Sequence, residues 1–393
     1  MDIAELFIKS FVDQATKKAF EFVPQKFSEL FGQKSPSDVI KVFLSGYFYR
    51  EDLIQALLFS QDLSHRLGRT DFIDYDAYKD YYPLDKKKLS LKYRNRVKEV
   101  EFPFKEEINF ILHPGTQIAV KGIRRYIMPS NLEQLTDTNL QDFLAKKKTY
   151  NGPNLRLASL KKVSPNRYEC QLERAEYFPQ VRTNLSVDYR LKGGRRPTLR
   201  LLDMNEKKGL KPLEQSVMVN TIGTSAVVYF RKGEYVYFLM KLRKQLGIYE
   251  NMLGTTSGEV ENPHEGGEPK ELITFVAEEM KREFAFETGL NPGKTVKRIQ
   301  PLAFTRDLIR GGKPQFFFLI EVSEVSENDF SPAFKKSIEG VDEFHDDLVR
   351  KLRFWSAMSP EFTLNLFYAF QALLSEKRLN ENSEALDLDH RLA

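Results

Sequence analysis

The most constraining stretch of this chain is PQFFFLIEVS, residues 314–323, which is apolar almost throughout. A strand with one wet face alternates apolar and polar residues, whereas a nearly continuous apolar run is typical of a strand covered on both faces. IQPLAFTRDL, residues 299–308, precedes it and is a second predicted strand. The sequence therefore predicts that at least one strand of the sheet is buried from both sides.

Two further segments predict β-hairpins. Residues 154–163 and 167–175 alternate apolar with polar residues on either side of Ser164-Pro165-Asn166. IGTSAVVYF and EYVYFLMKLR flank Lys232-Gly233 and are rich in the branched and aromatic residues that suit a pleated surface. The last predicted element is a helix that begins at Pro360 with Ser359 as its N-cap.

A chain of 393 residues is longer than one hydrophobic core usually organises, so the length favours two domains, which we place at residues 1–150 and 151–393. Residues 4–31 predict an amphipathic helix, broken near Pro24. Such a helix usually packs on its own domain, and the alternative is a contact with a membrane surface or a protein partner. The first 150 residues therefore predict a helical and aromatic-basic region whose role stays open.

Residues 71–126 carry clusters of tyrosine, lysine and arginine, for which base stacking and phosphate contacts are conceivable. Aspartates precede the basic run, and a mixed charge run is usually a solvated face. The net charge of +5 is also small for so many ionisable groups. Nucleic acid is thus not an expected partner.

Composition further narrows the class of protein. Hydrophobic residues make up 41% and charged residues 29% of the chain, and no long uncharged apolar run predicts a transmembrane segment. Acidic residues near the start are opposite to the basic start of a secretory signal, so we expect a cytoplasmic protein. The single cysteine, Cys170, has no partner for a disulfide or a zinc cluster.

A glutamate-rich helix is predicted from Glu268-Pro269 to Gly289. Proline is tolerated at the first helical position, and glycine readily adopts the left-handed conformation that ends a helix. The order along the chain is hairpin, glycine-bearing loop, acidic helix, loop and strand.

Within this helix, Glu279, Glu283 and Glu287 recur every four residues, so their carboxylates project from one side. Like charges stacked in this way repel and need compensation. Two compensators are open: the basic pair Lys281-Arg282, or a hard divalent metal ion.

The end of this helix resembles the signature segment of the Nudix hydrolase family. That segment has an arginine and a glutamate, an apolar residue, a pair of glutamates, and a closing glycine with an apolar residue. Of the pair of glutamates, this chain has the second, Glu287. The matching residues are Arg282, Glu283, Phe284, Glu287, Gly289 and Leu290.

Three positions depart from the family pattern. Glu268 stands at the opening glycine, Thr274 at the upstream glutamate, and Phe286 at the first of the paired glutamates. The preceding SGEVE, residues 257–261, resembles the glycine-rich segment that lines the family's site. From it we expect Gly258 and Glu259 to bind substrate.

The resemblance implies an α/β fold with a mixed sheet between helices over residues 151–393, and a nucleotide as ligand. It implies Mg²⁺-dependent (or Mn²⁺-dependent) hydrolysis of a pyrophosphate bond in a nucleoside diphosphate-linked substrate. Glu283 and Glu287 would then be metal ligands, with Glu279 filling a gap left by the departures. Arg282 would act with Glu283 in catalysis by orienting a carboxylate.

Two alternatives accompany this expectation. With two of the family's carboxylates replaced, the domain is alternatively a catalytically degenerate one that binds or senses a nucleotide and signals to a partner.

VDEFHDDLVRK, residues 341–351, is a candidate source of a catalytic base, and the alternative is an exposed acidic start of a helix.

Overall fold

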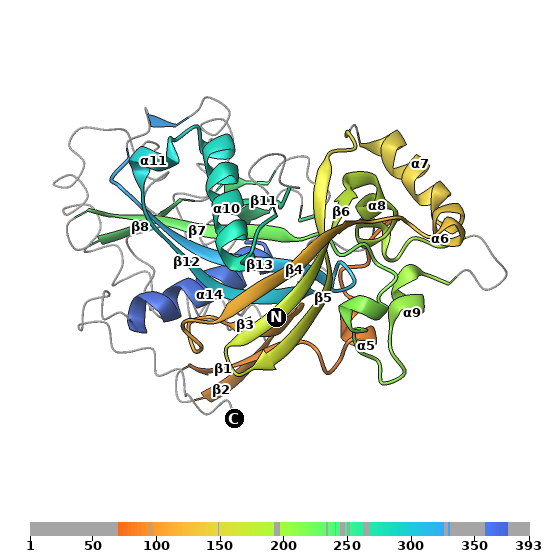
Figure 1. Ribbon diagram of the computed structural model, residues 1–393. Helices are drawn as coiled ribbons and strands as arrows, with labels where there is room; N and C mark the ends of the chain where they lie inside the picture. Colours follow the sequence, from red (N-terminus) through yellow and green to blue (C-terminus); the bar gives the residue numbers. More distant parts are fainter. Residues whose placement is uncertain are drawn as a thin grey trace.

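The computed structural model describes residues 70–93, 96–147, 149–191, 197–232, 235–239, 241–243, 248–249, 252–261, 268–325, 329–330 and 358–375. The fold is mixed α/β with mixed sheets, as predicted (Figure 1). The predictions for residues 4–31 and 341–351 lie outside the described residues. Among the described helices, none has the length and apolar character needed to span a membrane.

A six-stranded sheet forms the centre of the described structure, in the order β11-β7-β13-β12-β3 with β8 also paired to β7. Strand β13 pairs in parallel with β7 and antiparallel with β12, so the sheet is mixed. Its strands are β3 (Phe104–Asn109), β7 (Gly223–Lys232), β8 (Tyr235–Leu239), β11 (Thr256–Glu259), β12 (Val296–Asp307) and β13 (Lys313–Val322). The central place of β13 accounts for its apolar run, and the β7–β8 hairpin is confirmed.

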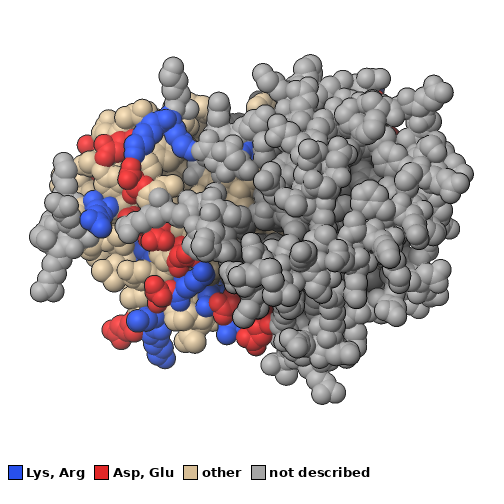
Figure 2. Space-filling view, turned by 180° about the vertical axis from the view of Figure 1, so that it is seen from behind, with Lys and Arg blue, Asp and Glu red and all other residues tan. Residues whose placement is uncertain are grey.

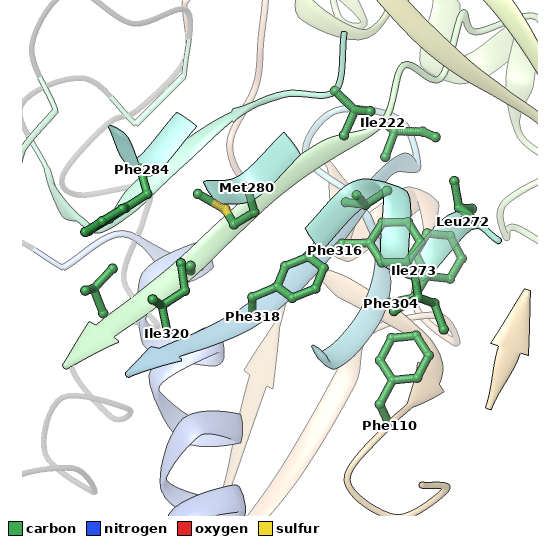
Figure 3. Packing of buried hydrophobic residues seen from close by; sticks show 14 of the residues in the cluster. Phe110, Ile222, Leu272, Ile273, Met280, Phe284, Phe304, Phe316, Phe318 and Ile320 are labelled. Atoms are coloured by element: carbon green, nitrogen blue, oxygen red, sulfur yellow. The ribbon is translucent and has the colours of Figure 1, made fainter. Parts of the chain in front are cut away.

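Helices α10 (Leu272–Thr288) and α14 (Pro360–Ser375) cover the two faces of this sheet (Figure 1). Phe316 and Phe318 pack with Met280 and Phe284 of α10 (Figure 3). The intervening Phe317 belongs instead to the cluster that α14 forms on the other face. Successive residues of a strand point to opposite faces, so an apolar run without alternation fills both layers.

The ends of both helices follow from local signals. Gly289 ends α10 in the left-handed conformation with φ 78°, as predicted. The helix begins at Leu272, three residues beyond the predicted Pro269. Its cap is Glu271, whose side chain accepts a hydrogen bond from the Thr274 N–H. At the start of α14, the Ser359 hydroxyl accepts a hydrogen bond from the Phe362 N–H at 3.1 Å.

A second, three-stranded sheet has the order β4-β6-β5, where β4 is Gln117–Arg125, β5 is Pro153–Ser164 and β6 is Arg167–Glu176. The predicted hairpin of β5 and β6 is confirmed. Strand β4 pairs in parallel with β6, and β3 pairs with β12 of the central sheet. Both sheets therefore contain strands from either side of residue 150, and a domain boundary at that residue does not separate one sheet from the other.

The remaining elements are short. The strands are β1 (Lys87–Tyr93), β2 (Arg96–Phe102), β9 (Lys241–Leu242) and β10 (Leu253–Gly254). The helices are α5 (Tyr78–Tyr81), α6 (Ser130–Leu135), α7 (Asp137–Lys146), α8 (Tyr177–Arg182), α9 (Leu199–Asp203) and α11 (Pro292–Thr295), with 3-10 turns η1 (Asn184–Ser186) and η2 (Leu213–Gln215).

The lysines of the aromatic-basic stretch have acidic neighbours. Lys86 lies 2.6 Å from Glu101 and Lys87 lies 2.9 Å from Glu106. On the face shown in Figure 2, the acidic and basic side chains of the described residues are interspersed rather than gathered into patches of one sign. The charges of Lys86 and Lys87 are thus compensated within the fold.

The turn between β12 and β13, residues 308–312, is buried, and its backbone depends on Arg200 of α9. The Arg200 guanidinium donates to the carbonyls of Leu308 at 2.5 Å and Ile309 at 2.7 Å. It also forms two hydrogen bonds with the Asp188 carboxylate, at 2.6 and 2.7 Å. A buried carbonyl without a donor is costly, so this arginine ties α9 to the central sheet.

Replacing Arg200 tests this dependence. Arg200→Met keeps the apolar stem but leaves the buried Asp188 carboxylate without its cation and removes a donor from the Leu308 and Ile309 carbonyls, so we expect the free energy of unfolding to fall by about 3–5 kcal/mol. Urea denaturation measures the loss. Arg125→Met, at an exposed position of β4, is the control and should change stability by no more than about 0.5 kcal/mol. Equal effects of the two substitutions would contradict the role given to Arg200.

Candidate functional site

The three predicted glutamates of α10 lie along its contact with β11. The carboxylate of Glu287 accepts a hydrogen bond from the Ser257 N–H at 3.2 Å, and that of Glu279 accepts one from the Glu261 N–H at 3.2 Å. Between them, Glu283 packs on the backbone of Gly258. A methyl group added at Gly258 would lie 2.4 Å from the Glu283 carboxyl carbon, so a side chain at this position would displace the carboxylate.

Arg282 lies among the carboxylates rather than away from them. Its Nη2 is 3.0 Å from Glu279 Oε2, 3.2 Å from Glu283 Oε1 and 3.4 Å from Glu261 Oε2. Burial lowers the pKa of the Arg282 guanidinium, but the hydrogen bond and charge of Glu279 and the charges of Glu261 and Glu283 raise it above its ordinary value. The predicted compensation by arginine is thus present for Glu279, Glu283 and Glu261.

The carboxyl group of Glu283 has a raised pKa. Burial raises its pKa from an ordinary 4.5 to about 7. Arg282 opposes this shift, whereas the charges of Glu287, Glu261 and Glu279 add to it. A buried carboxyl among like charges gains most from a cation, because a cation favours its charged form.

Glu259 lies elsewhere, although it follows Gly258 directly in the sequence. Its carboxylate accepts hydrogen bonds from Gln180 Nε2 at 3.0 Å and Thr221 Oγ1 at 3.2 Å, and it is 3.0 Å from Lys313 Nζ. Adjacent residues of a strand point to opposite faces of a sheet. The structure therefore brings Gly258, Arg282 and the three glutamates of α10 together and places the Glu259 side chain on the other face.

Sequence reasoning missed one member of the cluster, Glu261. It lies beyond the end of β11, where strand alternation no longer fixes the direction of a side chain. Its presence in the SGEVE segment was the only available signal.

Two of the positions that depart from the family pattern carry side chains without a carboxylate. Phe286, between Glu283 and Glu287, is 83% exposed and offers no oxygen. Thr274 donates its hydroxyl to the Glu271 carboxylate at 2.8 Å at the start of α10. These positions therefore supply no carboxylate to the cluster.

The chemistry of this cluster fits a hard divalent cation. Carboxylate oxygens are the ligands that Mg²⁺ and Mn²⁺ prefer, and Glu283 packs against bare backbone where any other side chain at position 258 would displace it. As placed, no three His, Cys, Asp or Glu side chains of the described residues converge closely enough to hold a metal ion. The backbone N–H groups that bond Glu279 and Glu287 use the Oε2 atom of each carboxylate, so ligation of a cation would fall to the Oε1 atoms or replace these bonds.

Comparison with known proteins gives a partial structural likeness. No family model matches the sequence, and no curated protein matches it. A Nudix hydrolase from M. Smegmatis is similar to 31% of this chain, with 83% of its own length covered, 13% sequence identity and a TM-score of 0.19.

A second solved structure is a bifunctional NMN adenylyltransferase/ADP ribose pyrophosphatase from Francisella tularensis, complexed with AMP and a Mn ion. It is similar to 40% of this chain, with 11% identity and a TM-score of 0.22, and the match spans 42% of its own length. In both comparisons the matched part is less than half of the present chain.

The raised pKa of Glu283 predicts a pH-dependent stability. Between pH 4.5 and about 7 the folded state binds more protons than the unfolded state, so the wild type loses stability as pH rises through this window. Glu283→Gln removes the titration. In EDTA we expect the free energy of unfolding of the variant, relative to that of the wild type, to rise by on the order of 2 kcal/mol between pH 4.5 and pH 8. Chemical denaturation across this range measures the gap, and a gap that does not change with pH would refute the assignment.

Proposed function

We propose that this chain binds a divalent cation at the α10 carboxylates and hydrolyses a pyrophosphate bond in a nucleoside diphosphate-linked substrate. The observation that carries the proposal is the packing of the buried Glu283 carboxyl on Gly258, in a cluster where Arg282 contacts Glu261, Glu279 and Glu283 and the charge of Glu287 also acts on Glu283. A cluster with this excess of negative charge is stabilised by a cation.

The residues of the cluster have separate tasks in this proposal. Glu283 and Glu287 would hold Mg²⁺ or Mn²⁺, with Glu279 as a further ligand. The bound ion would neutralise charge on the phosphate oxygens. Arg282 orients Glu279 and Glu283 through contacts of 3.0 and 3.2 Å, which leaves a fixed arrangement of carboxylate oxygens at the helix surface.

A second candidate function rests on Phe286. An exposed aromatic side chain stands between Glu283 and Glu287, where the family has a carboxylate. This favours a domain that binds or senses a nucleotide without turnover and reports to a protein partner. Such a domain would keep the fold and the ligand while lacking a catalytic ligand.

A hydrolysis screen separates the two candidates. Nucleoside triphosphates, dinucleoside polyphosphates, ADP-ribose, NAD and nucleotide sugars are tested with Mg²⁺ or Mn²⁺. For the enzyme we expect turnover that requires the metal and that falls by about 100-fold or more in Glu283→Gln, because glutamine keeps the shape but removes the charge.

Glu278→Gln is the matched control, since this residue lies on the exposed side of the same helix and pairs with Lys281 at 2.6 Å. It should retain turnover within about threefold, which is the scale of a surface change. No turnover on any compound, with nucleotide still raising the melting temperature, would reject the hydrolase and support the sensor.

A further inference from the structure

Lys313 is the first residue of β13, but its ammonium group lies beside Glu259 of β11, which is separated from β13 by one strand. The strand between them is β7, where Gly223 lies opposite Gln315 of β13 on one side and opposite Glu259 of β11 on the other. A methyl group at Gly223 would lie 2.5 Å from Lys313 Nζ and 2.2 Å from Gln315 Oε1. The missing side chain at Gly223 is therefore what lets Lys313 reach across β7.

At the end of this reach, Lys313 pairs with Glu259. Their Nζ and Oε2 atoms are 3.0 Å apart, and the lysine side chain is fully buried. Burial lowers the pKa of Lys313 to about 8, against the charge of Glu259, which favours the ammonium form. A buried cation of this kind needs its carboxylate, since removal of one partner leaves an uncompensated charge.

Strand β11 connects this pair to the α10 cluster. It is a four-residue strand at the edge of the sheet, with β7 as its neighbour. One face carries Glu259 and its pair with Lys313. Toward α10, the same strand offers Gly258 beneath the Glu283 carboxyl and the Ser257 N–H to Glu287. Ser257, Gly258 and Glu259 are consecutive. The position at which the Glu259 side chain is held therefore also fixes where the backbone of Ser257 and Gly258 meets the α10 carboxylates.

We infer that Lys313 is a positioning residue for the α10 cluster: through Glu259 it holds β11 in the place from which this strand contacts the carboxylates. Its effect on cation binding rests on the proposed function. Its effect on β11 does not.

Amide hydrogen exchange of the full, metal-free chain tests the effect on β11. In Lys313→Met we expect amides of residues 256–260 to exchange about 10-fold faster or more, because the edge strand opens locally. Amides of β12 and α14 should keep their rates. General loss of stability would instead speed exchange throughout, and unchanged exchange at residues 256–260 would overturn the inference.

A second variant reaches the same pair without changing any charge. Gly223→Ala places a methyl group where Lys313 Nζ passes and should speed exchange in the same residues. Gly254→Ala is the matched control, because its methyl group would meet the Arg243 side chain, with Cδ at 2.9 Å, and neither Lys313 nor Glu259. It should leave exchange at residues 256–260 unchanged.

Titration with Mn²⁺, followed by electron paramagnetic resonance, tests the link to the cluster. We expect the affinity for Mn²⁺ to fall about 10-fold in Lys313→Met and Gly223→Ala, and not in Gly254→Ala. Faster exchange with unchanged Mn²⁺ affinity would overturn the positioning role. A wild type that binds no Mn²⁺ would overturn the proposed function, and hydrogen exchange alone would then decide whether Lys313 holds β11.

Discussion

The turn between β12 and β13 is buried, and this constraint organises the structure around it. Its carbonyl groups must find donors within the chain. Arg200 supplies two of them, Asn184 Nδ2 donates to the Arg310 carbonyl at 2.8 Å, and Arg306 Nε donates to the Gly312 carbonyl at 2.9 Å. The two central strands can form their hairpin here only if the segment that carries η1 and α9 folds against it.

The same turn also fixes the start of β13, from which Lys313 reaches β11. Asp307 accepts hydrogen bonds from the Ile309 N–H at 2.9 Å and from Arg310 Nε at 2.6 Å, which fixes the turn from within. Gly312, with φ 86°, then leads directly into Lys313. The charge of Arg310 helps to lower the pKa of Lys313, after burial. One buried hairpin therefore couples the scaffold to the lysine that reaches β11.

The sequence predicted the features that depend on local pattern. The hairpins, the end of α10 at Gly289 and the row of glutamates follow from alternation, capping and helical spacing. Contacts between distant segments were not predictable in this way. The pairing of β3 with β12 and the bond of Arg200 to the turn depend on tertiary packing. The opposite directions of Gly258 and Glu259 would have followed from alternation only if the short β11 had been recognised as a strand.

Gly223 and Gly258 give this edge of the sheet an unusual response to sequence change. In most of a core, an added methyl group meets apolar carbon, and neighbouring side chains of smaller volume can compensate. At these two positions it would meet an ammonium nitrogen or a carboxyl carbon whose charge has a partner elsewhere. A shorter charged residue on another element, such as aspartate for Glu283, would make room for it. A substitution at either glycine would therefore disturb an ion pair, of Lys313 with Glu259 or of Glu283 with Arg282, as well as fill space.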